Sequence, residues 1–316
     1  MLTISISFAL FFYFQNQTET EIKESIFEQQ KKNQVDKTKA IAENVESTLN
    51  LIMAKLEGLS SSGALQQGDF SSAHAGEILE DRFGQIDDIT PIDRLFILDE
   101  KGIAKRAVAK EGLPQYIGVN FNYFEWIRES KDTLSPVFSD TYIGRDGKYK
   151  IGLAYPVVVN NTREEHVGSI VVVIPASEFF KHFGNIYDIK SSYLSVLDSK
   201  AVQIVHPLKE LVGKPFFSYE TQKITGRNKE LNNHLKTVLT EGKPSSLIYD
   251  FKTEERLYTG YSVLLEGIPP LFPLCDNSNI HYLFQNQRDN PYRTITNVLI
   301  DCRNSCCNHD INLIFG

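Results

Sequence analysis

The chain has 316 residues, with 33 basic and 40 acidic residues and a formal net charge of -7. Phosphate recognition needs clustered Lys and Arg, and no basic block occurs, so the composition excludes a nucleic-acid partner. The length predicts about two domains of ~150 residues each. All cysteines lie at or after Cys275, which excludes a disulfide framework for the preceding chain.

The most apolar stretch is the first. Residues 2–14 carry no charge, yet as a helix they would span only about 20 Å of the ~30 Å hydrocarbon core of a bilayer. They also lack the preceding Lys or Arg of a signal peptide. We interpret residues 1–14 as a truncated transmembrane helix, which predicts attachment to a membrane. The alternative is a buried core helix.

Residues 15–60 follow a helical period. Apolar residues recur at spacings of three and four and so lie on one face of a helix; they are Val45, Leu49, Ile52, Leu56 and Leu59. No Pro or Gly precedes the last turn, which predicts one stalk helix of about 40 residues, roughly 60 Å long. Its apolar stripe would pack on the domains that follow, or on the same helix of a second copy in a homodimer.

Residues 61–187 are predicted to form one module. The predicted elements are, in order, a helix (76–89), two strands (95–98 and 103–108), a helix (123–130) and three antiparallel strands (134–143, 149–159 and 167–174). Asp146-Gly147 supplies the positive backbone angles of a hairpin turn, and Asn160-Asn161 marks a second turn. This order predicts an antiparallel sheet that encloses a ligand between its concave face and the segments over it.

A smaller copy of the same pattern is predicted at residues 188–267. Both copies contain an apolar strand ending in Leu-Asp, a polar turn, a second strand, and Gly before an aromatic residue. The matched pairs are Asp99 with Asp198, Gly118 with Gly213, Phe121 with Phe216, and Tyr155 with Tyr261. Internal similarity of this kind indicates that one folding unit is used twice.

The tail, residues 268–316, departs from the pattern. The closing strand of the second module is due here, but Pro269, Pro270 and Pro273 cannot donate to a central ladder. We therefore predict an irregular tail that is not the native continuation. No zinc pattern fits the metal-like cluster in this tail, which consists of Cys302, Cys306, Cys307 and His309, so no metal is predicted.

The duplicated segments resemble a known family. LFILDEKGIAKR (95–106) and LSVLDSKAVQIVHPLKELVGKPFF (194–217) resemble the double Cache (dCache) extracytoplasmic sensor domain of prokaryotic chemoreceptors and sensor histidine kinases, over roughly residues 41–267. The resemblance implies an α+β fold with two PAS-like antiparallel-sheet modules in tandem along a long N-terminal helix. It also implies a membrane-distal module that binds a ligand and a membrane-proximal module.

Family members that bind amino acids carry an Arg-x-Trp-Tyr motif, a following Tyr and Asp, and a further Asp on the closing strand. Trp126 matches the Trp, but Phe124 and Ile127 replace the Arg and the second aromatic residue. Phe138 and Asp140 match the Tyr and Asp, whereas the closing strand offers no acid. Without the Arg to fork onto a carboxylate, this departure argues against an amino-acid ligand.

Aromatic residues are frequent in the first module, and an aromatic-walled pocket with one acid suits an amine or another flat, weakly polar ligand. The residues predicted to bind it are Tyr123, Trp126, Phe138, Asp140, Tyr142 and Tyr155. For each aromatic residue the alternative is a place in the core. An anion would instead meet the nearest cations, Arg128, Arg145 and Lys148. His206, before Pro207, either senses pH or shapes a turn.

These observations predict the ligand-sensing part of a membrane signal-transduction receptor, with both modules on the extracytoplasmic side of the cell membrane and a small organic molecule bound in the distal module. The alternative is a non-signalling scaffold or dimerisation module from a truncated receptor. No G-x-S-x-G, H-E-x-x-H or P-loop motif occurs, so neither catalysis nor a cofactor is predicted.

Overall fold

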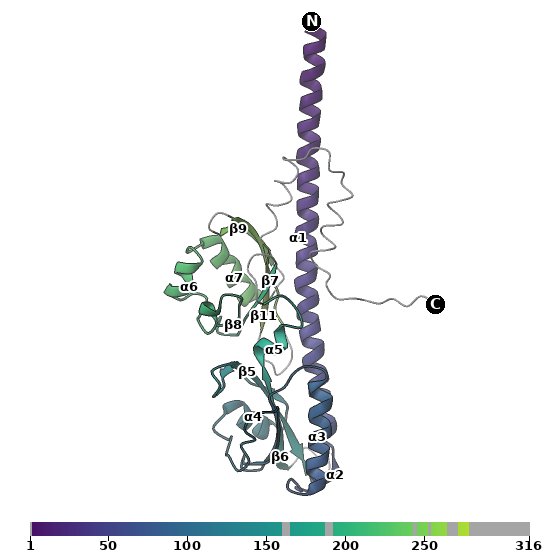
Figure 1. Ribbon diagram of the computed structural model, residues 1–316, viewed down its shortest axis with the longest axis vertical. Helices are drawn as coiled ribbons and strands as arrows, with labels where there is room; N and C mark the ends of the chain where they lie inside the picture. The colour runs from purple at the N-terminus through teal and green to yellow at the C-terminus, as the bar shows by residue number, and fades with distance from the viewer. Residues whose placement is uncertain are drawn as a thin grey trace, which may run out of the picture.

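A long helix carries two α+β modules along its side (Figure 1). The computed structural model describes residues 2–159, 165–186, 192–242, 245–251, 254–263 and 271–277. The helix is α1 (Leu2–Ser60), and its end away from the N-terminus meets the first module, here called the distal module. The second, proximal module lies beside the middle of α1 (Figure 1). The predicted α+β fold with two antiparallel sheets and a long N-terminal helix is confirmed.

The predicted apolar stripe of α1 is buried. The five residues of the stripe are at most 1% exposed; they are Val45, Leu49, Ile52, Leu56 and Leu59. Nearer the N-terminus, the side-chain amide of Gln34 donates to the carbonyl oxygens of Leu257 (2.8 Å) and Cys275 (3.1 Å) in the proximal module. One helix is therefore bound to both modules, through apolar contacts on the distal sheet and through buried hydrogen bonds on the proximal sheet.

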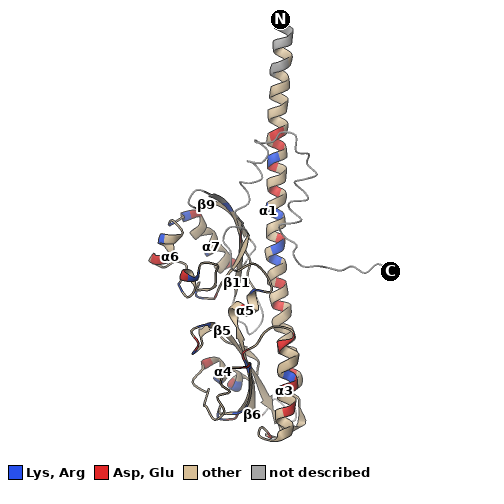
Figure 2. Cartoon of the chain, in the orientation of Figure 1, with Lys and Arg blue, Asp and Glu red and all other residues tan. Residues whose placement is uncertain are grey.

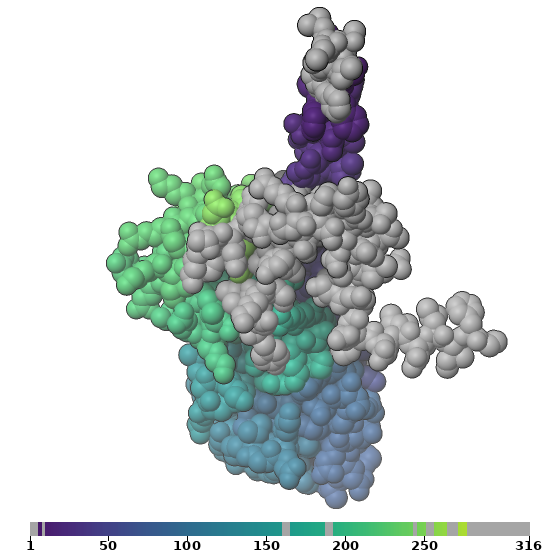
Figure 3. Space-filling model, turned by 45° about the horizontal axis from the view of Figure 1, so that its top comes forward, coloured from purple at the N-terminus to yellow at the C-terminus, as the bar shows by residue number. Residues whose placement is uncertain are grey.

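The first part of α1 stands clear of both modules (Figure 3). It carries no charged residue before Glu19, and charges follow along the rest of the helix (Figure 2). Its large apolar side chains are exposed, and they include Leu10, Phe11, Phe12, Tyr13 and Phe14. In the part of the chain that the structure describes, no helix has the length and apolar character needed to cross a membrane.

The distal module is a sheet with helices on both faces. Its helices are α2 (Gly63–Gln66), α3 (Ala73–Asp87), α4 (Glu125–Thr133) and α5 (Ala176–Phe180). Its strands are β1 (Arg94–Asp99), β2 (Ala104–Ala109), β3 (Val137–Phe138), β4 (Tyr142–Ile143), β5 (Tyr149–Val158) and β6 (His166–Pro175). The antiparallel order is β2-β1-β6-β5-β3, and β4 also pairs with β5. The apolar run predicted as a central strand is β6, and its residues from Gly168 onward are buried.

The proximal module repeats this order. Its strands are β7 (Tyr193–Leu197), β8 (Gln203–Val205), β9 (Ser245–Phe251), β10 (Glu254–Gly260) and β11 (Phe272–Asn277). Its helices are η2 (Lys209–Leu211), α6 (Tyr219–Ile224) and α7 (Lys229–Glu241). The order β8-β7-β11-β10-β9 matches the distal sheet, with β11 in the central place of β6.

Strand β11 corrects the prediction of an irregular tail from residue 268. It pairs with β7 on one side and β10 on the other, although it contains Pro273. The Pro273 carbonyl accepts a hydrogen bond from the Tyr261 N–H (3.1 Å). The Pro273 nitrogen, which has no hydrogen to donate, therefore faces Tyr261, and Tyr261 lies one residue beyond the end of β10 at Gly260. The proline therefore costs a bond at the margin of the ladder rather than within it. Residues 278–316, with the Cys and His cluster, lie outside the described residues.

The predicted duplication extends to backbone detail. Asp99 accepts backbone N–H bonds from Lys101 and Ile103, and Asp198 accepts the same bonds from Lys200 and Val202. Gly118 and Gly213, the matched glycines, both have positive φ (82° and 86°), which glycine adopts at little cost. Each donates to the first strand residue after the turn, Ala104 or Gln203. One folding unit is indeed used twice.

Candidate ligand-binding site

The distal module holds a cavity of about 560 Å³. It lies on the face of the sheet opposite α1, because side chains alternate along each strand. On β1, Leu95 and Ile97 belong to the core shared with α1, whereas Arg94 and Phe96 line the cavity. The volume lies within the ~300–1,000 Å³ of small-molecule pockets.

Two of the predicted binding residues line this cavity. Tyr142 on β4 is half-buried there, and burial raises the pKa of its hydroxyl, which keeps it neutral. Tyr123, just before α4, also lines the cavity and is 60% exposed. Phe124 lies between them, with ring centroids 4.4 Å from Tyr123 and 5.3 Å from Tyr142. Tyr123, Phe124 and Tyr142 thus form one aromatic wall of the cavity.

Trp126 supports that wall from behind. Its indole occupies the space where a side chain at Gly152 would stand, since a Cβ added there would lie 2.6 Å from the ring. It stacks on Tyr142 at a centroid distance of 6.4 Å and an interplanar angle of 26°. Trp126 is therefore a buried anchor that holds α4 on β5 and positions Tyr142, next to the cavity but not in its lining.

Phe138 and Tyr155 lie on the other face of the sheet. Both pack with the core on the α1 side, and Phe138 is only 3% exposed. Their neighbours Val137 and Ala154 face the cavity side instead. Strand residues alternate between the two faces of a sheet. The sequence predicts the strand but not which face packs on α1, so it does not show whether Phe138 and Tyr155 face the cavity or the core.

Asp140 points toward the proximal module. Its carboxylate pairs with the Lys200 ammonium (2.8 Å) and accepts from the Ser199 hydroxyl (3.0 Å). Beside it, the Thr141 hydroxyl donates to Asp198 (2.9 Å). The segment between β3 and β4 therefore joins the distal cavity, at Tyr142, to the turn between β7 and β8.

Several cavity residues were not among the predicted set. Arg94, Tyr116 and Lys150 come from β1, the loop after β2, and β5. A cation within an otherwise apolar strand is the signal that marks Arg94 and Lys150 in the sequence. Lys150 is 2% exposed and pairs with Asp93 and with Asp146 (2.7 Å). Of the three cations considered for an anion, Arg145 lines the cavity, whereas Arg128 and Lys148 do not.

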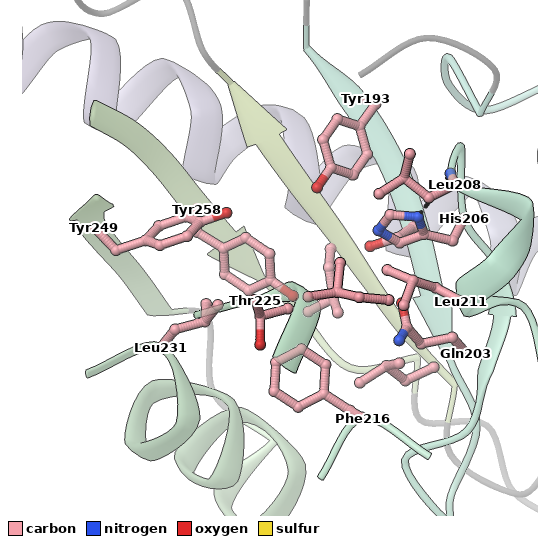
Figure 4. A pocket seen from close by; sticks show the side chains of 14 residues that line it. Tyr193, Gln203, His206, Leu208, Leu211, Phe216, Thr225, Leu231, Tyr249 and Tyr258 are labelled. Carbon is pink, nitrogen blue, oxygen red and sulfur yellow. Dashed lines mark hydrogen bonds between the residues drawn. The ribbon is translucent and has the colours of Figure 1, made fainter. Parts of the chain in front are cut away.

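The proximal module has a far smaller cavity at the matching place. It measures about 30 Å³ and lies among side chains from β7, β8, η2, α7, β9 and β10 (Figure 4). The Tyr193 and Tyr249 hydroxyls both donate to Asp276 (2.8 and 2.7 Å), an acid that is fully buried. Burial raises the pKa of Asp276, while these hydroxyls and Arg256 oppose the shift.

His206 also lines the smaller cavity (Figure 4). Its Nδ1 accepts the Leu208 N–H (2.9 Å), a bond that supports the turn-shaping interpretation of this residue. Burial lowers the pKa of His206 to about 4, so the ring is neutral near pH 7. Among the described residues, no group of three or more His, Cys, Asp or Glu side chains is placed to hold a metal ion.

Comparison with known proteins gives a family match and a set of similar folds. The chain matches the family model of the Cache domain over residues 18–266. No curated protein matches it significantly. The ligand-binding domain of the Pseudomonas aeruginosa PAO1 amino acid chemoreceptor PctB, in complex with L-Arg, has a TM-score of 0.58 at 13% identity, covering 85% of this chain and 99% of that chain.

Two further structures are similar over comparable lengths. The ligand-binding domain of the Campylobacter jejuni chemoreceptor Tlp3, in complex with L-valine, has a TM-score of 0.57 at 16% identity, with 82% of this chain and 96% of that chain covered. That of the Pseudomonas fluorescens chemoreceptor CtaA, in complex with L-serine, has a TM-score of 0.56 at 13% identity, with 80% and 98% covered. At these identities the likeness is one of fold.

Proposed function

Since this chain belongs to the Cache domain family, we propose that it is the extracytoplasmic ligand-sensing part of a membrane signal-transduction receptor, and that a small organic molecule binds in the cavity of its distal module. The observation that carries this proposal is the cavity of about 560 Å³ with its aromatic wall. The three similar chemoreceptor domains, each named as a complex with an amino acid, support a small-molecule ligand.

Ligand binding would reach the proximal module through the segment between β3 and β4. Tyr142 touches the cavity, while Thr141 and Asp140, directly before it, hold the turn at residues 198–200. A ligand that shifts Tyr142 would thus change how the two modules sit on α1. Such coupling requires that the ligand bind the two arrangements with different affinity.

The N-terminal part of α1 would place the receptor at the membrane and join two copies. The first part of α1 stands clear of both modules (Figure 3), and its large apolar side chains, including Leu10, Phe11 and Phe14, are exposed. A homodimer through α1 would bury this apolar surface and give a ligand-induced shift of one helix a partner to move against. We propose this arrangement as part of the receptor role.

The test is a binding screen of the purified chain against carboxylates, amines, amino acids and neutral aromatic compounds by calorimetry. Tyr142→Ala and Tyr123→Ala remove cavity wall and should each weaken the binding of any ligand found at least tenfold. Lys148→Ala serves as the matched control, because Lys148 lies on the hairpin beside the cavity without lining it, and its loss should leave affinity unchanged. A folded protein that binds nothing in the screen would favour the scaffold alternative.

A further inference from the structure

The cationic wall of the distal cavity identifies the class of ligand. We propose that this cavity selects an organic monoanion, a carboxylate on a flat apolar body, with Arg94 and Arg145 as the groups that receive the negative charge. The inference rests on the proposed function and assigns the ligand chemistry of the same cavity.

Two guanidinium groups at the cavity have no acidic partner among the described residues. Arg94 donates from Nε to the Pro114 carbonyl oxygen (2.9 Å), which leaves its two terminal nitrogens for other contacts. In the described part of the chain, no carboxylate pairs with Arg94 or Arg145, whereas Lys150 is paired with both Asp93 and Asp146. Two guanidiniums and one ammonium thus face two carboxylates, which leaves one net positive charge for a ligand to balance.

The two guanidinium groups are brought together on one aromatic ring. The central carbon of Arg94 lies 4.9 Å from the centroid of Tyr116, and that of Arg145 lies 5.1 Å from the same centroid. A cation over an aromatic face is stabilised by the ring quadrupole, which helps hold both side chains in place. Tyr116 itself has a φ of 57°, a backbone conformation that is uncommon outside glycine. The planar, five-donor guanidinium suits a carboxylate bidentately.

The rest of the cavity is apolar and flat-walled. Phe96 and Phe121 stand with ring centroids 5.0 Å apart, and Phe124 continues the surface to Tyr142. A flat apolar body fits against such rings through offset stacking. The charge and the apolar walls together describe an amphipathic anion rather than a small hydrated ion.

The acids near the cavity are already paired, which disfavours a cationic ligand. Asp146 is the one acid in the described lining, and it is engaged by Lys150. Asp140, which the sequence suggested as the partner of an ammonium, pairs with Lys200 instead. An amine would therefore enter beside two guanidinium groups and would meet no available carboxylate in the described lining, and the ammonium of an amino acid would lack a partner there.

A set of three matched probes tests the ligand class on the full chain. Benzoate, benzamide and benzylamine share one ring and differ in charge at a single substituent. Calorimetry should show benzoate binding most tightly and benzylamine not at all, and benzoate affinity should fall as salt rises because part of the attraction is between exposed charges.

Arg145→Gln should weaken benzoate at least about tenfold, as expected for loss of a charge-assisted hydrogen bond, and Arg94→Gln should do the same. Lys148→Gln is the matched control, since Lys148 lies on the same hairpin but does not line the cavity. Arg145 is exposed, so its replacement should preserve the fold, which circular dichroism checks.

The possible failures are distinct. If benzylamine or benzamide binds as tightly as benzoate and Tyr142→Ala abolishes the binding, the sensor function stands and the anion assignment is overturned. Unchanged benzoate affinity in Arg145→Gln and Arg94→Gln overturns it as well. If neither these probes nor the wider screen yields any Tyr142-dependent ligand, the proposed function itself fails.

Discussion

The distal and proximal modules share a frame but treat the same space differently. One holds a cavity of about 560 Å³ and the other a space of about 30 Å³. When the two modules are aligned on Asp99 and Asp198, Arg94 corresponds to Tyr193 and Ala104 corresponds to Gln203. In the proximal module, Tyr193 and Gln203 line the small cavity, and the Tyr193 hydroxyl donates to a buried acid, Asp276. The duplicated fold supplies a place for a cavity, and the side chains over it decide whether the place stays open.

The modules also differ in how they use polar groups. The proximal module pairs Asp276 with two tyrosine hydroxyls and places Arg256 3.6 Å away, all within its interior. Among the residues that the structure describes, no carboxylate pairs with Arg94 or Arg145 at the wall of the distal cavity. Paired groups support folding, whereas cations facing an open cavity are suited to a ligand. Substitutions at matched places should separate these two uses.

The largest effect is expected at the buried acid of the proximal module. Asp276→Ala removes the acceptor of two buried hydroxyls and the counter-charge of Arg256, and should lower the free energy of unfolding by about 3–5 kcal/mol. Asp146→Ala in the distal module should cost less than about 1 kcal/mol, because its carboxylate is partly exposed and Lys150 keeps Asp93. Urea unfolding of both variants measures the difference. Equal losses would contradict the proposed division.

A methyl group added to each sheet gives the next largest effect. Gly152→Ala would place Cβ 2.6 Å from the rigid indole of Trp126, so α4 must shift and stability should fall by about 1–3 kcal/mol. Gly260→Ala in the proximal sheet meets the ends of Leu274 and Val238, which move more easily, and should cost less. Thermal unfolding tests the order. Ligand affinity should also fall in Gly152→Ala, because Trp126 positions Tyr142.

Acid should weaken the protein through its buried histidines. Burial lowers the pKa of His206 and of His234 in the folded proximal module to about 4, below the ordinary value of 6.5. The unfolded chain therefore binds more protons than the folded chain between pH 6.5 and about 4, so stability is lost as the pH falls through that window. His206→Gln should reduce this pH dependence. If the free energy of unfolding depends on pH in the same way in His206→Gln and in the parent protein, His206 does not contribute to the loss of stability in acid.

The smallest effect is expected at the exposed contact between the modules. Asp140→Asn removes the charge that pairs with Lys200, and exposed ion pairs of this kind contribute about 0–1 kcal/mol. Its stability should therefore hardly change, while the response of the proximal module to a distal ligand should weaken. Hydrogen exchange at residues 198–202, with and without ligand, provides the measurement. A response identical to that of the parent protein would exclude this route of coupling.

The residue pattern alone was enough to predict the long helix, its buried stripe and the duplicated modules. These features depend on local periods and on repeated residues such as Asp99 and Asp198, which the chain displays directly. It also identified Tyr123 and Tyr142 as cavity residues, since aromatic residues clustered around the start of α4 and β4.

Contacts between segments far apart in the chain set which face of each strand packs on α1 and which charged groups pair. Alternation along a strand defines two faces but not which of them a helix far earlier in the chain will cover, so the prediction that Phe138 and Tyr155 line the cavity is wrong. In the same way, Lys200 forms an ion pair with Asp140, and Arg94 and Arg145 both lie over the ring of Tyr116, although these residues are far apart in the sequence. The place of β11, despite Pro273, followed from its neighbours in the sheet and not from its own residues.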